Sequence, residues 1–416
     1  MPDVNEPRTF ETGVDHSRAV LPGAPHSWSY STLKEVEACP RRYSLSRASY
    51  PELWDRRGFP QAPVRAALFG DVVHGAIERI LRALVAADCT SVKSAESVAV
   101  LKALGGYTAV AEQVLAERLV QLDGNPRLPA ERRRRLDREL RDRMPDARGE
   151  IQEYLSRLPT LPPATPPAPS GDGNTRDDGG QRASGRREIT NGPHPELDLA
   201  AESLRLVGRI DLLTLDDDGA HITDFKTGAE DPSHQEQLLT YALLWAQDHV
   251  VNPHRRPCLE LRAAYPNRDS VFPAPVDDAL AELESQIVAR IHAADDSVET
   301  ESPDARLSDR CGLCGVRPLC ANYWADLATA AVPSTDGEWF DLQGTVVNQN
   351  GVKSWIVELE GGHGSILVRT PSPSDSLPLG KSLRLLGVRR VIDPENPDSL
   401  IAAMGTRTET FVLAGT

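Results

Sequence analysis

Several features that would place a protein in a familiar class are missing from this 416-residue sequence. No apolar run approaches the roughly 18 residues that a membrane-spanning helix needs. The first residues, MPDVNEPRTFETGVDH, are acidic and lack the apolar stretch of a secretory signal. There is no GxxxxGK[ST] phosphate loop and no internal repeat. These absences predict no membrane contact, a cytoplasmic location, and no ATP-driven motor within this chain.

Positive charge is also in short supply. Lys and Arg number 46 against 61 Asp and Glu, which gives a formal net charge of -15. A protein that coats nucleic acid by bulk electrostatics needs a basic surface, so the acidic balance argues against that class. Divalent cations or a local basic channel can still meet phosphates on an acidic protein. Basic stretches occur at 132–135, where interleaved acids indicate a solvated helix face, and at Arg182, Arg186 and Arg187.

The six cysteines are too few, in a chain this long, to indicate a disulfide framework. Cys311, Cys314 and Cys320 supply three soft ligands in one short segment, and Cys39 could arrive as a fourth from far upstream. Four thiolates suit tetrahedral zinc or a 4Fe-4S cluster, and spacing alone leaves both open. Such a staple closes a very long loop, worth roughly 5 kcal/mol in chain entropy, which predicts a structural role. Two cysteines have no partner spacing and are predicted to be incidental thiols: Cys89 and Cys258.

The length predicts more than one structural unit. Residues 1–26 have little periodicity and are predicted to form a flexible lead, followed by a domain over 27–330. Within that domain, residues 158–193 are rich in Pro, Gly and Ser, which is typical of a disordered insert. Residues 336–416 alternate short apolar runs with turn residues and predict a small β-barrel, for which the oligonucleotide-binding type is one candidate. Its aromatic residues are candidates for base stacking or for the barrel core: Trp339, Phe340 and Trp355.

The middle of the chain predicts an α/β core. A helix is expected from Ser29, with Ser31 as its N-cap, and β-type runs flank a hairpin signal at Asp216–Gly219. The remaining predicted elements are helices at 66–87, within 94–157, at 233–248 and at 276–293, and a strand at 258–265.

Residues that could carry chemistry gather around this hairpin. Asp224 and Lys226 are two residues apart in a predicted strand, so both side chains project from one face, and Asp211 lies on the preceding strand. Magnesium or manganese held by carboxylates acidifies bound water and acts as a Lewis acid, which is what phosphodiester hydrolysis requires. A lysine beside the metal stabilises the developing negative charge. His74, in GDVVHGAIE, could complete an oxygen-rich site and would favour manganese.

Six motifs occur in a fixed order over about residues 28–324. They are SYSTL with CPRRY, GDVVH, GRIDLL, DFKTG, Gln237-x-x-x-Tyr241, and CGLC with the final Cys320. This order resembles the RecB-like branch of the PD-(D/E)xK nuclease superfamily, as found in AddB, exonuclease V and CRISPR-associated RecB-like exonucleases. The resemblance implies a restriction-endonuclease-like α/β core, here with a helical N-terminal part and the small C-terminal β-barrel.

The resemblance also implies roles for individual residues. His74, Asp211 and Asp224 would bind Mg²⁺ or Mn²⁺ together with the backbone carbonyl of Phe225, and Lys226 would be the catalytic lysine beside Asp211 and Asp224. Two residues would lie on one helix face and help to place the DNA: Gln237 and Tyr241. For the cysteine staple, the resemblance favours a 4Fe-4S cluster over Zn²⁺ at Cys39, Cys311, Cys314 and Cys320.

Some positions depart from the family pattern. An acidic residue often precedes the GRID-type strand, and Glu188, Glu196 and Glu202 are all candidates for that place. Ile210 stands where the superfamily name has proline, which contributes no ligand. Nothing about the 158–193 insert follows from the resemblance.

The leading hypothesis is therefore a metal-dependent DNA nuclease. By family analogy it is a single-strand-preferring exonuclease rather than an endonuclease, acting in repair, recombination or defence. DNA is the expected partner, and the missing motor allows for a helicase in trans. The alternatives are a non-catalytic DNA-binding or assembly module stabilised by the cluster, and a redox or iron sensor built on the cysteines.

Overall fold

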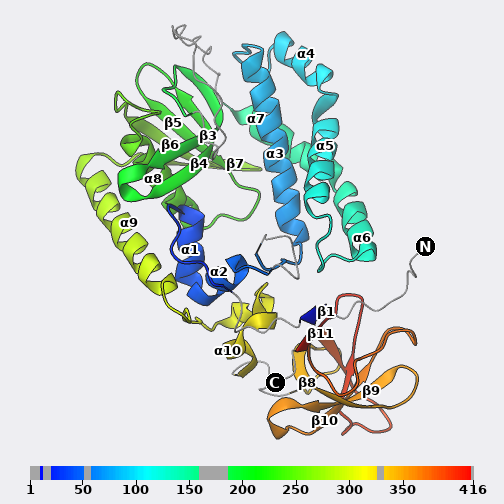
Figure 1. Ribbon diagram of the computed structural model, residues 1–416. Coiled ribbons are helices and arrows are strands. Elements are labelled where there is room, and N and C mark those ends of the chain that lie inside the picture. The colour runs from blue at the N-terminus through cyan, green and yellow to red at the C-terminus, as the bar shows by residue number, and fades with distance from the viewer. Residues whose placement is uncertain (1–9, 13–19, 51–57, 159–185, 326–331, 414–416) are drawn as a thin grey trace, which may run out of the picture.

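The structure is a computed structural model that describes residues 10–12, 20–50, 58–158, 186–325 and 332–413. It is a mixed α/β protein in which a helix-covered sheet and a separate β-barrel are joined through the cysteine segment (Figure 1). This confirms the predicted α/β class, the helical N-terminal part and the C-terminal barrel.

The first sheet has the strand order β2-β4-β5-β6-β7, with β3 pairing along the other side of β4. β4 and β5 form the antiparallel hairpin that Asp216–Gly219 predicts, and β5 runs parallel to β6 after a helical crossover. The predicted strand at 258–265 is therefore confirmed, whereas β7 was not predicted. The strands are β2 (Trp28–Ser29), β3 (Gly192–Ala201), β4 (Leu206–Leu215), β5 (Ala220–Phe225), β6 (Cys258–Tyr265) and β7 (Arg268–Pro273).

Helices cover this sheet in two groups (Figure 1). The crossover helix α8 and the long α9 pack in one hydrophobic cluster with Trp28, Leu213 and Ile222. The second cluster joins the apolar stripe of α3 to α5, α7 and the sheet residues Leu212 and Phe225. The helices are α3 (Arg65–Ala86), α4 (Ala95–Ala103), α5 (Gly106–Gln121), α6 (Ala130–Arg141), α7 (Met144–Arg157), α8 (Pro232–Gln247) and α9 (Asp277–Val298).

The first helical segment differs from the prediction in its cap. Helix α1 (Tyr30–Ala38) is capped by Ser29, whose side chain accepts from the Thr32 backbone N–H while the Thr32 hydroxyl accepts from the Ser29 N–H. Ser31 is thus not the N-cap, because the chain already turns helical at Tyr30. Cys39 is extended and ends α1, and Pro40 begins α2 (Pro40–Arg47), so Cys39 lies at a bend between two helices.

The C-terminal sheet closes into a barrel of five strands, because β11 pairs with both β12 and β8. The short apolar runs predicted over 336–416 form strands β8 to β13. β10 and β12 are parallel, and β13 extends the sheet beyond β11. The strands are β8 (Trp339–Gln349), β9 (Ser354–Leu359), β10 (Ser365–Arg369), β11 (Ser382–Val391), β12 (Ile401–Ala403) and β13 (Glu409–Leu413).

Two of the predicted irregular segments are partly ordered. Within the predicted 1–26 lead, β1 (Phe10–Thr12) pairs in parallel with β13 of the barrel, and Arg205 donates to the carbonyls of Pro25 and His26. In the predicted 158–193 insert, residue 158 ends α7 and Gly192 begins β3, while 159–185 lie outside the described residues.

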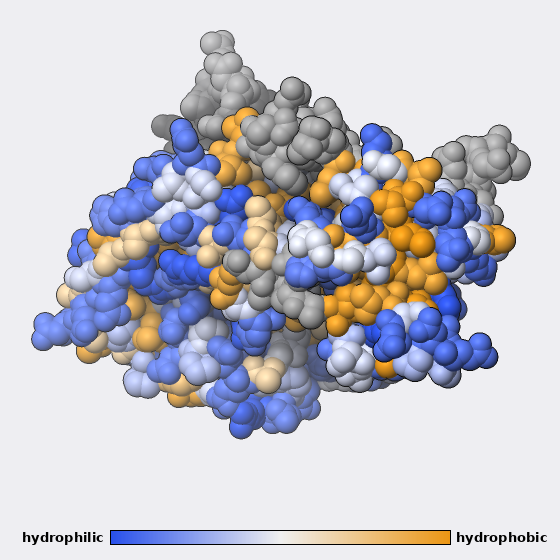
Figure 2. Space-filling model, turned by 90° about the horizontal axis from the view of Figure 1, so that it is seen from below, coloured by the Kyte–Doolittle hydropathy of each residue, from blue (hydrophilic) through white to orange (hydrophobic). Residues whose placement is uncertain are grey.

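The barrel aromatics are mostly not available for stacking. Trp355 is buried and Phe340 packs against the barrel core, whereas Trp339 is 58% exposed. Apolar side chains gather on the barrel side of the molecule when it is seen from below, and Val347, Val352 and Leu379 are among the exposed ones (Figure 2). Of the two alternatives for these residues, Phe340 and Trp355 therefore fit the barrel core, and Trp339 is left exposed.

The described helices include no single one that is long and apolar enough to cross a membrane. The bent pair α4 and α5 passes the length and composition criteria only when the two are taken together.

Candidate active site

The β4–β5 hairpin places two carboxylates side by side. Its register pairs Leu212 with Thr223, so the next residues outward, Asp211 and Asp224, face each other across the two strands. An oxygen of Asp211 accepts from the Phe225 backbone N–H at 2.7 Å, which fixes that carboxylate at the end of β5. The two acids that the sequence places on neighbouring strands are therefore brought together.

Lys226 completes this pair at the point where β5 ends. Its ammonium nitrogen lies 2.5 Å from Oδ2 of Asp224 and donates to Oε1 of Gln237 at 2.6 Å. Gln237 in turn donates through Nε2 to the Tyr241 hydroxyl at 2.7 Å. The lysine is thus held between a strand and a helix, and the structure brings Gln237 and Tyr241 next to it.

Close backbone approach makes this arrangement possible at two glycines. A Cβ on Gly208 of β4 would lie 2.7 Å from Leu244 and 3.1 Å from Tyr241, so glycine lets α8 pack directly on the strand. A Cβ on Gly70 of α3 would lie 2.8 Å from the Thr227 hydroxyl, next to Lys226. The glycines in the GRID and GDVVH motifs are therefore explained by packing against the site.

His74 reaches the carboxylates from the opposite side, on α3. Its Nδ1 lies 3.6 Å from Oδ2 of Asp211. Burial lowers the pKa of His74, and the negative charge of Asp224 only partly opposes that effect. The neutral imidazole that results is the form that binds metals.

Burial and mutual repulsion shape the acids of the site. Burial, and next the charge of Asp224, raise the pKa of Asp211 well above its usual range. One buried oxygen of Asp224, Oδ2, has no hydrogen bond of acceptable geometry despite its closeness to the lysine. Crowded carboxylates beside a neutral imidazole suit a divalent cation, which would relieve their mutual repulsion.

Of the three candidates for the upstream acid, Glu196 lies nearest. It is opposite Asp211 in the β3–β4 pairing, at a residue with a φ of 52°, and its charge acts on Asp211. Glu188 instead pairs with His254 at the surface, and Glu202 is 86% exposed. Burial, and then the neighbouring Glu78, raise the pKa of Glu196 to about 7.

Tyr154 is a site residue that the sequence did not reveal. Its hydroxyl donates to the Lys226 carbonyl at 2.7 Å, and its ring packs edge-on against Phe225 with centroids 5.5 Å apart. It arrives from α7, more than 70 residues upstream of DFKTG. Tyr154 therefore packs on Phe225 and holds the backbone carbonyl of Lys226 at the end of β5.

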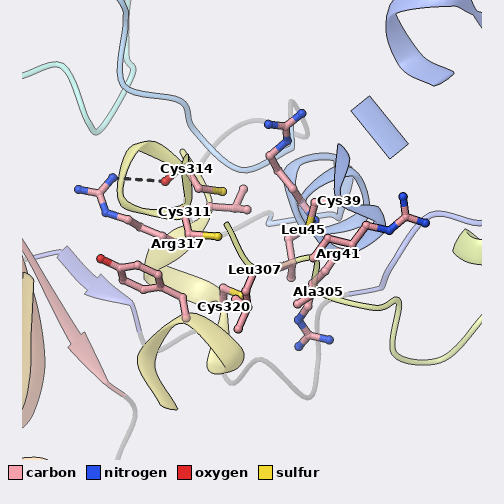
Figure 3. A pocket seen from close by; sticks show the side chains of 13 residues that line it. Cys39, Arg41, Leu45, Ala305, Leu307, Cys311, Cys314, Arg317 and Cys320 are labelled. Atoms are coloured by element: carbon pink, nitrogen blue, oxygen red, sulfur yellow. Dashed lines mark hydrogen bonds between the residues drawn. The ribbon is translucent and has the colours of Figure 1, made fainter. Parts of the chain in front are cut away.

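The four cysteines surround one cavity between α2 and the segment that leads to the barrel (Figure 3). Cys39 faces Cys311, Cys314 and Cys320. Cys311 lies in the short helix η3 (Asp309–Leu313), Cys314 directly follows it, and Cys320 lies between η4 (Arg317–Leu319) and α10 (Ala321–Tyr323). Burial raises the pKa of Cys314 and Cys320, and their thiols interact with that of Cys39. The predicted set of four is therefore brought together around this cavity.

Positive charge also lines the cysteine cavity. Arg42 lowers the pKa of Cys314 and Arg41 lowers that of Cys320, in both cases against the larger effect of burial. The Arg42 Nε is buried without a hydrogen-bond partner. Soft thiols, apolar walls and guanidinium groups fit an anionic thiolate-bound centre.

Within the described residues, the donor side chains of neither site are drawn together as they are around a bound metal ion. Within the described ranges, no three His, Cys, Asp or Glu side chains converge closely enough to ligate one metal ion. The fit therefore rests on the donor sets and their surroundings, not on ligand distances.

Comparison with protein families decides the identity of the fold. The PD-(D/E)XK nuclease superfamily matches residues 27–321. The chain belongs to this superfamily. Its members are nucleases that typically use Mg²⁺ or Mn²⁺, and the carboxylates and lysine at the β4–β5 hairpin lie within the matched residues.

Other comparisons are weaker. Among curated proteins no sequence matches this chain. An OB domain from Methanosarcina mazei shares 18% identity over 20% of this chain and 77% of its own length, with a TM-score of 0.16. The structure of SSO0001 shares 18% over 31% and 61%, with a TM-score of 0.20. A murine DNA-binding protein bound to double-stranded DNA shares 8% over 54% and 96%, with a TM-score of 0.16. These likenesses carry no argument.

Proposed function

We propose that this superfamily member is a RecB-like, Mg²⁺- or Mn²⁺-dependent deoxyribonuclease whose site is built from His74, Asp211, Asp224 and Lys226. The observation that carries the proposal is the pair of carboxylates at the hairpin, with the Lys226 ammonium 2.5 Å from Oδ2 of Asp224. Its preferred substrate is single-stranded DNA with a free end, and an exonuclease is favoured over an endonuclease by the family resemblance.

Each residue has a distinct task in this proposal. His74, Asp211, Asp224 and the Phe225 carbonyl would hold the metal, which supplies an acidified water and offsets charge on the phosphate. Lys226 keeps a fixed positive charge next to the reacting phosphate, because Gln237 anchors its ammonium group. Glu196 adds a further carboxylate on the β3 side, and Gln237 and Tyr241 place the DNA.

The decisive experiment is degradation of end-labelled single- and double-stranded DNA with Mg²⁺ or Mn²⁺. Asp224→Ala and Lys226→Ala are each expected to reduce cleavage at least about 100-fold, because the first removes a metal ligand and the second removes the positive charge beside the phosphate. Asp218→Ala is the matched control, since this acid lies exposed at the turn of the same hairpin.

Either of two results would contradict the proposal. Full activity of both site variants would show that the carboxylates and lysine are not catalytic. A wild-type protein that binds DNA but does not cut it, with either metal and any substrate, would favour the non-catalytic binding module. Length and position of the labelled products distinguish exonuclease from endonuclease action, and addition of a helicase tests for a partner in trans.

We further propose that the cysteine cavity holds a 4Fe-4S cluster. It is supported by the four thiols that line one cavity and by the arginine charge beside them. Anaerobically purified protein is expected to carry about four iron and about four acid-labile sulfide atoms per chain. Cys314→Ser should lose them and unfold at a lower temperature, whereas Cys258→Ser, outside the cavity, should keep them. Stoichiometric zinc without sulfide would refute the cluster.

A further inference from the structure

One face of α8 carries three polar residues at helical spacing. His234, Gln237 and Tyr241 lie three and four residues apart, so their side chains project from the same side of the helix. Gln237 contacts the Lys226 ammonium and Tyr241 contacts Gln237, so this side faces the candidate active site. His234 extends the same row by one turn, although it belongs to none of the motifs in the sequence.

The partner of His234 belongs to the sheet edge that carries Lys226. Its Nδ1 lies 2.8 Å from the hydroxyl of Tyr265, and the two rings have centroids 5.8 Å apart. Tyr265 is buried and follows Ala264, whose carbonyl accepts from the Lys226 backbone N–H at 2.8 Å. Helix and sheet therefore hold the His234 ring beside the end of β5.

The charge and tautomer of His234 follow from its surroundings. Burial lowers its pKa, as does the Lys226 ammonium, while Asp224, Asp231 and Glu230 act in the opposite direction. Burial raises the pKa of Tyr265, which keeps its hydroxyl protonated. That hydroxyl can donate to Nδ1, and the neutral ring then carries its hydrogen on Nε2.

The second ring nitrogen is free to meet a ligand. Nε2 of His234 has no hydrogen-bond partner in the described part of the chain, and it is not enclosed by protein. It is thus an N–H donor of fixed orientation, on the same helix face as the group that anchors the lysine. A preorganised donor at such a place stabilises negative charge that grows in a transition state.

We propose that His234 is a further phosphate-binding residue of this nuclease, donating from Nε2 to a non-bridging oxygen of the scissile phosphodiester, with Tyr265 as its positioning residue. The inference rests on the proposed function, since it needs the phosphate to lie at Asp224 and Lys226. It adds a neutral donor on the side of the site opposite α3 and His74.

His234→Gln and His234→Asn distinguish phosphate binding through Nε2 from a purely structural contact through Nδ1. The Gln amide nitrogen reaches the place of imidazole Nε2, whereas the Asn amide reaches that of Nδ1. His234→Gln should therefore cut DNA within about fivefold of wild type, while His234→Ala and His234→Asn should lose roughly 10- to 100-fold in single-turnover rate. Tyr265→Phe should show a smaller loss, and for all four kcat should fall more than KM changes. His254→Ala, a histidine that is 74% exposed, is the control.

Failure of the His234 assignment can be distinguished from failure of the proposed nuclease function. Asp224→Ala is assayed in parallel, and continued cutting by that variant would refute the catalytic site and this inference with it. If Asp224→Ala is inactive but His234→Ala cuts at the wild-type rate, only the His234 assignment fails. Activity that His234→Asn retains but His234→Gln loses would also overturn it. The important atom would then be Nδ1, which contacts the Tyr265 hydroxyl, and not Nε2. Thermal unfolding of each variant identifies any loss of fold, and the Gln–Asn contrast is then read from the variants that remain folded.

Discussion

Glu196 is held in a setting that disfavours its charge. Its side chain is 15% exposed, and its nearest cation, Arg209, is 3.9 Å away and is itself bound to Asp198 at 2.7 Å. Glu78 adds like charge from α3. Burial and Glu78 favour the neutral carboxyl of Glu196. Between pH 4.5 and about 7, the folded, metal-free protein therefore keeps a proton on Glu196 that the unfolded chain has released.

This proton predicts how stability depends on pH. Between the ordinary value of 4.5 and the raised pKa of about 7, the folded state binds more protons than the unfolded state. The free energy of unfolding in EDTA should therefore fall as pH rises through this window, by up to about 3 kcal/mol from this group. Glu196→Gln cannot ionise, so its stability in urea unfolding should decline less between pH 5 and pH 8.

The matched control for this experiment is Glu202→Gln, because Glu202 lies on the same chain segment but is exposed. Its pH profile should follow that of wild type. Parallel profiles for wild type and Glu196→Gln would contradict the assignment of the raised pKa. Saturating Mn²⁺ should flatten the wild-type profile, because a bound cation favours the ionised carboxylates.

At the scale of elements, local patterns were sufficient for the parts that carry their own signal. The turn residues between β4 and β5 predicted the hairpin, and its register is what brings Asp211 beside Asp224. The 3.6-residue period predicted α3 and α8, and alternation predicted the barrel strands. The motif residues of the site lie on these elements, which is why sequence reasoning could name them.

What the sequence did not predict depends on contacts between distant segments. Tyr154 reaches Lys226 from a helix that precedes it by more than 70 residues, and no local pattern marks that contact. Glu196 could not be separated from Glu188 and Glu202 until the β3–β4 register was known. β1 pairs with β13 across almost the whole chain, and short strands of three residues carry little periodicity.

The choice between zinc and an iron-sulfur cluster has the same origin. The spacing of Cys311, Cys314 and Cys320 identifies a ligand segment. Whether one zinc ion or a larger iron-sulfur cluster fits depends on the distance between Cys39 and that segment. That distance is set by the packing of α2 against the barrel junction, where Leu45, Leu319 and Trp324 share one hydrophobic cluster. A tertiary arrangement, and not a motif, therefore determines how the four cysteines lie around their cavity.

On the scale of the whole molecule, one buried arginine contacts the nuclease domain, the cysteine segment and the barrel. Arg127, in the helical layer, donates to Glu409 of β13 at 2.7 Å and to the Gly315 carbonyl of the cysteine segment at 2.6 Å. It also donates to the Pro60 carbonyl at 3.0 Å, and its side chain is only 2% exposed. Arg127 and Glu409 thus stand where nuclease domain, cysteine segment and barrel meet.

Removing one member of this pair should cost far more than removing both. Arg127→Met leaves the Glu409 carboxylate, itself 8% exposed, with only the longer 3.3 Å contact from Arg132. The expected loss in free energy of unfolding is about 3–5 kcal/mol, because a buried charge is left nearly uncompensated. Arg127→Met combined with Glu409→Gln removes both charges and should recover a large part of that loss.

Urea unfolding of the single and double variants, analysed as a double-mutant cycle, measures this coupling. Arg134→Met is the control. Among the described residues, the Arg134 side chain forms only a 3.4 Å hydrogen bond to the Ala130 carbonyl, so this change should alter stability by no more than about 0.5 kcal/mol. Additive losses would show that Arg127 and Glu409 act independently. A strong coupling, together with separate unfolding of the barrel in Arg127→Met, would instead show that this ion pair makes the barrel unfold together with the nuclease domain. The same arginine also binds the segment that carries Cys311 and Cys314.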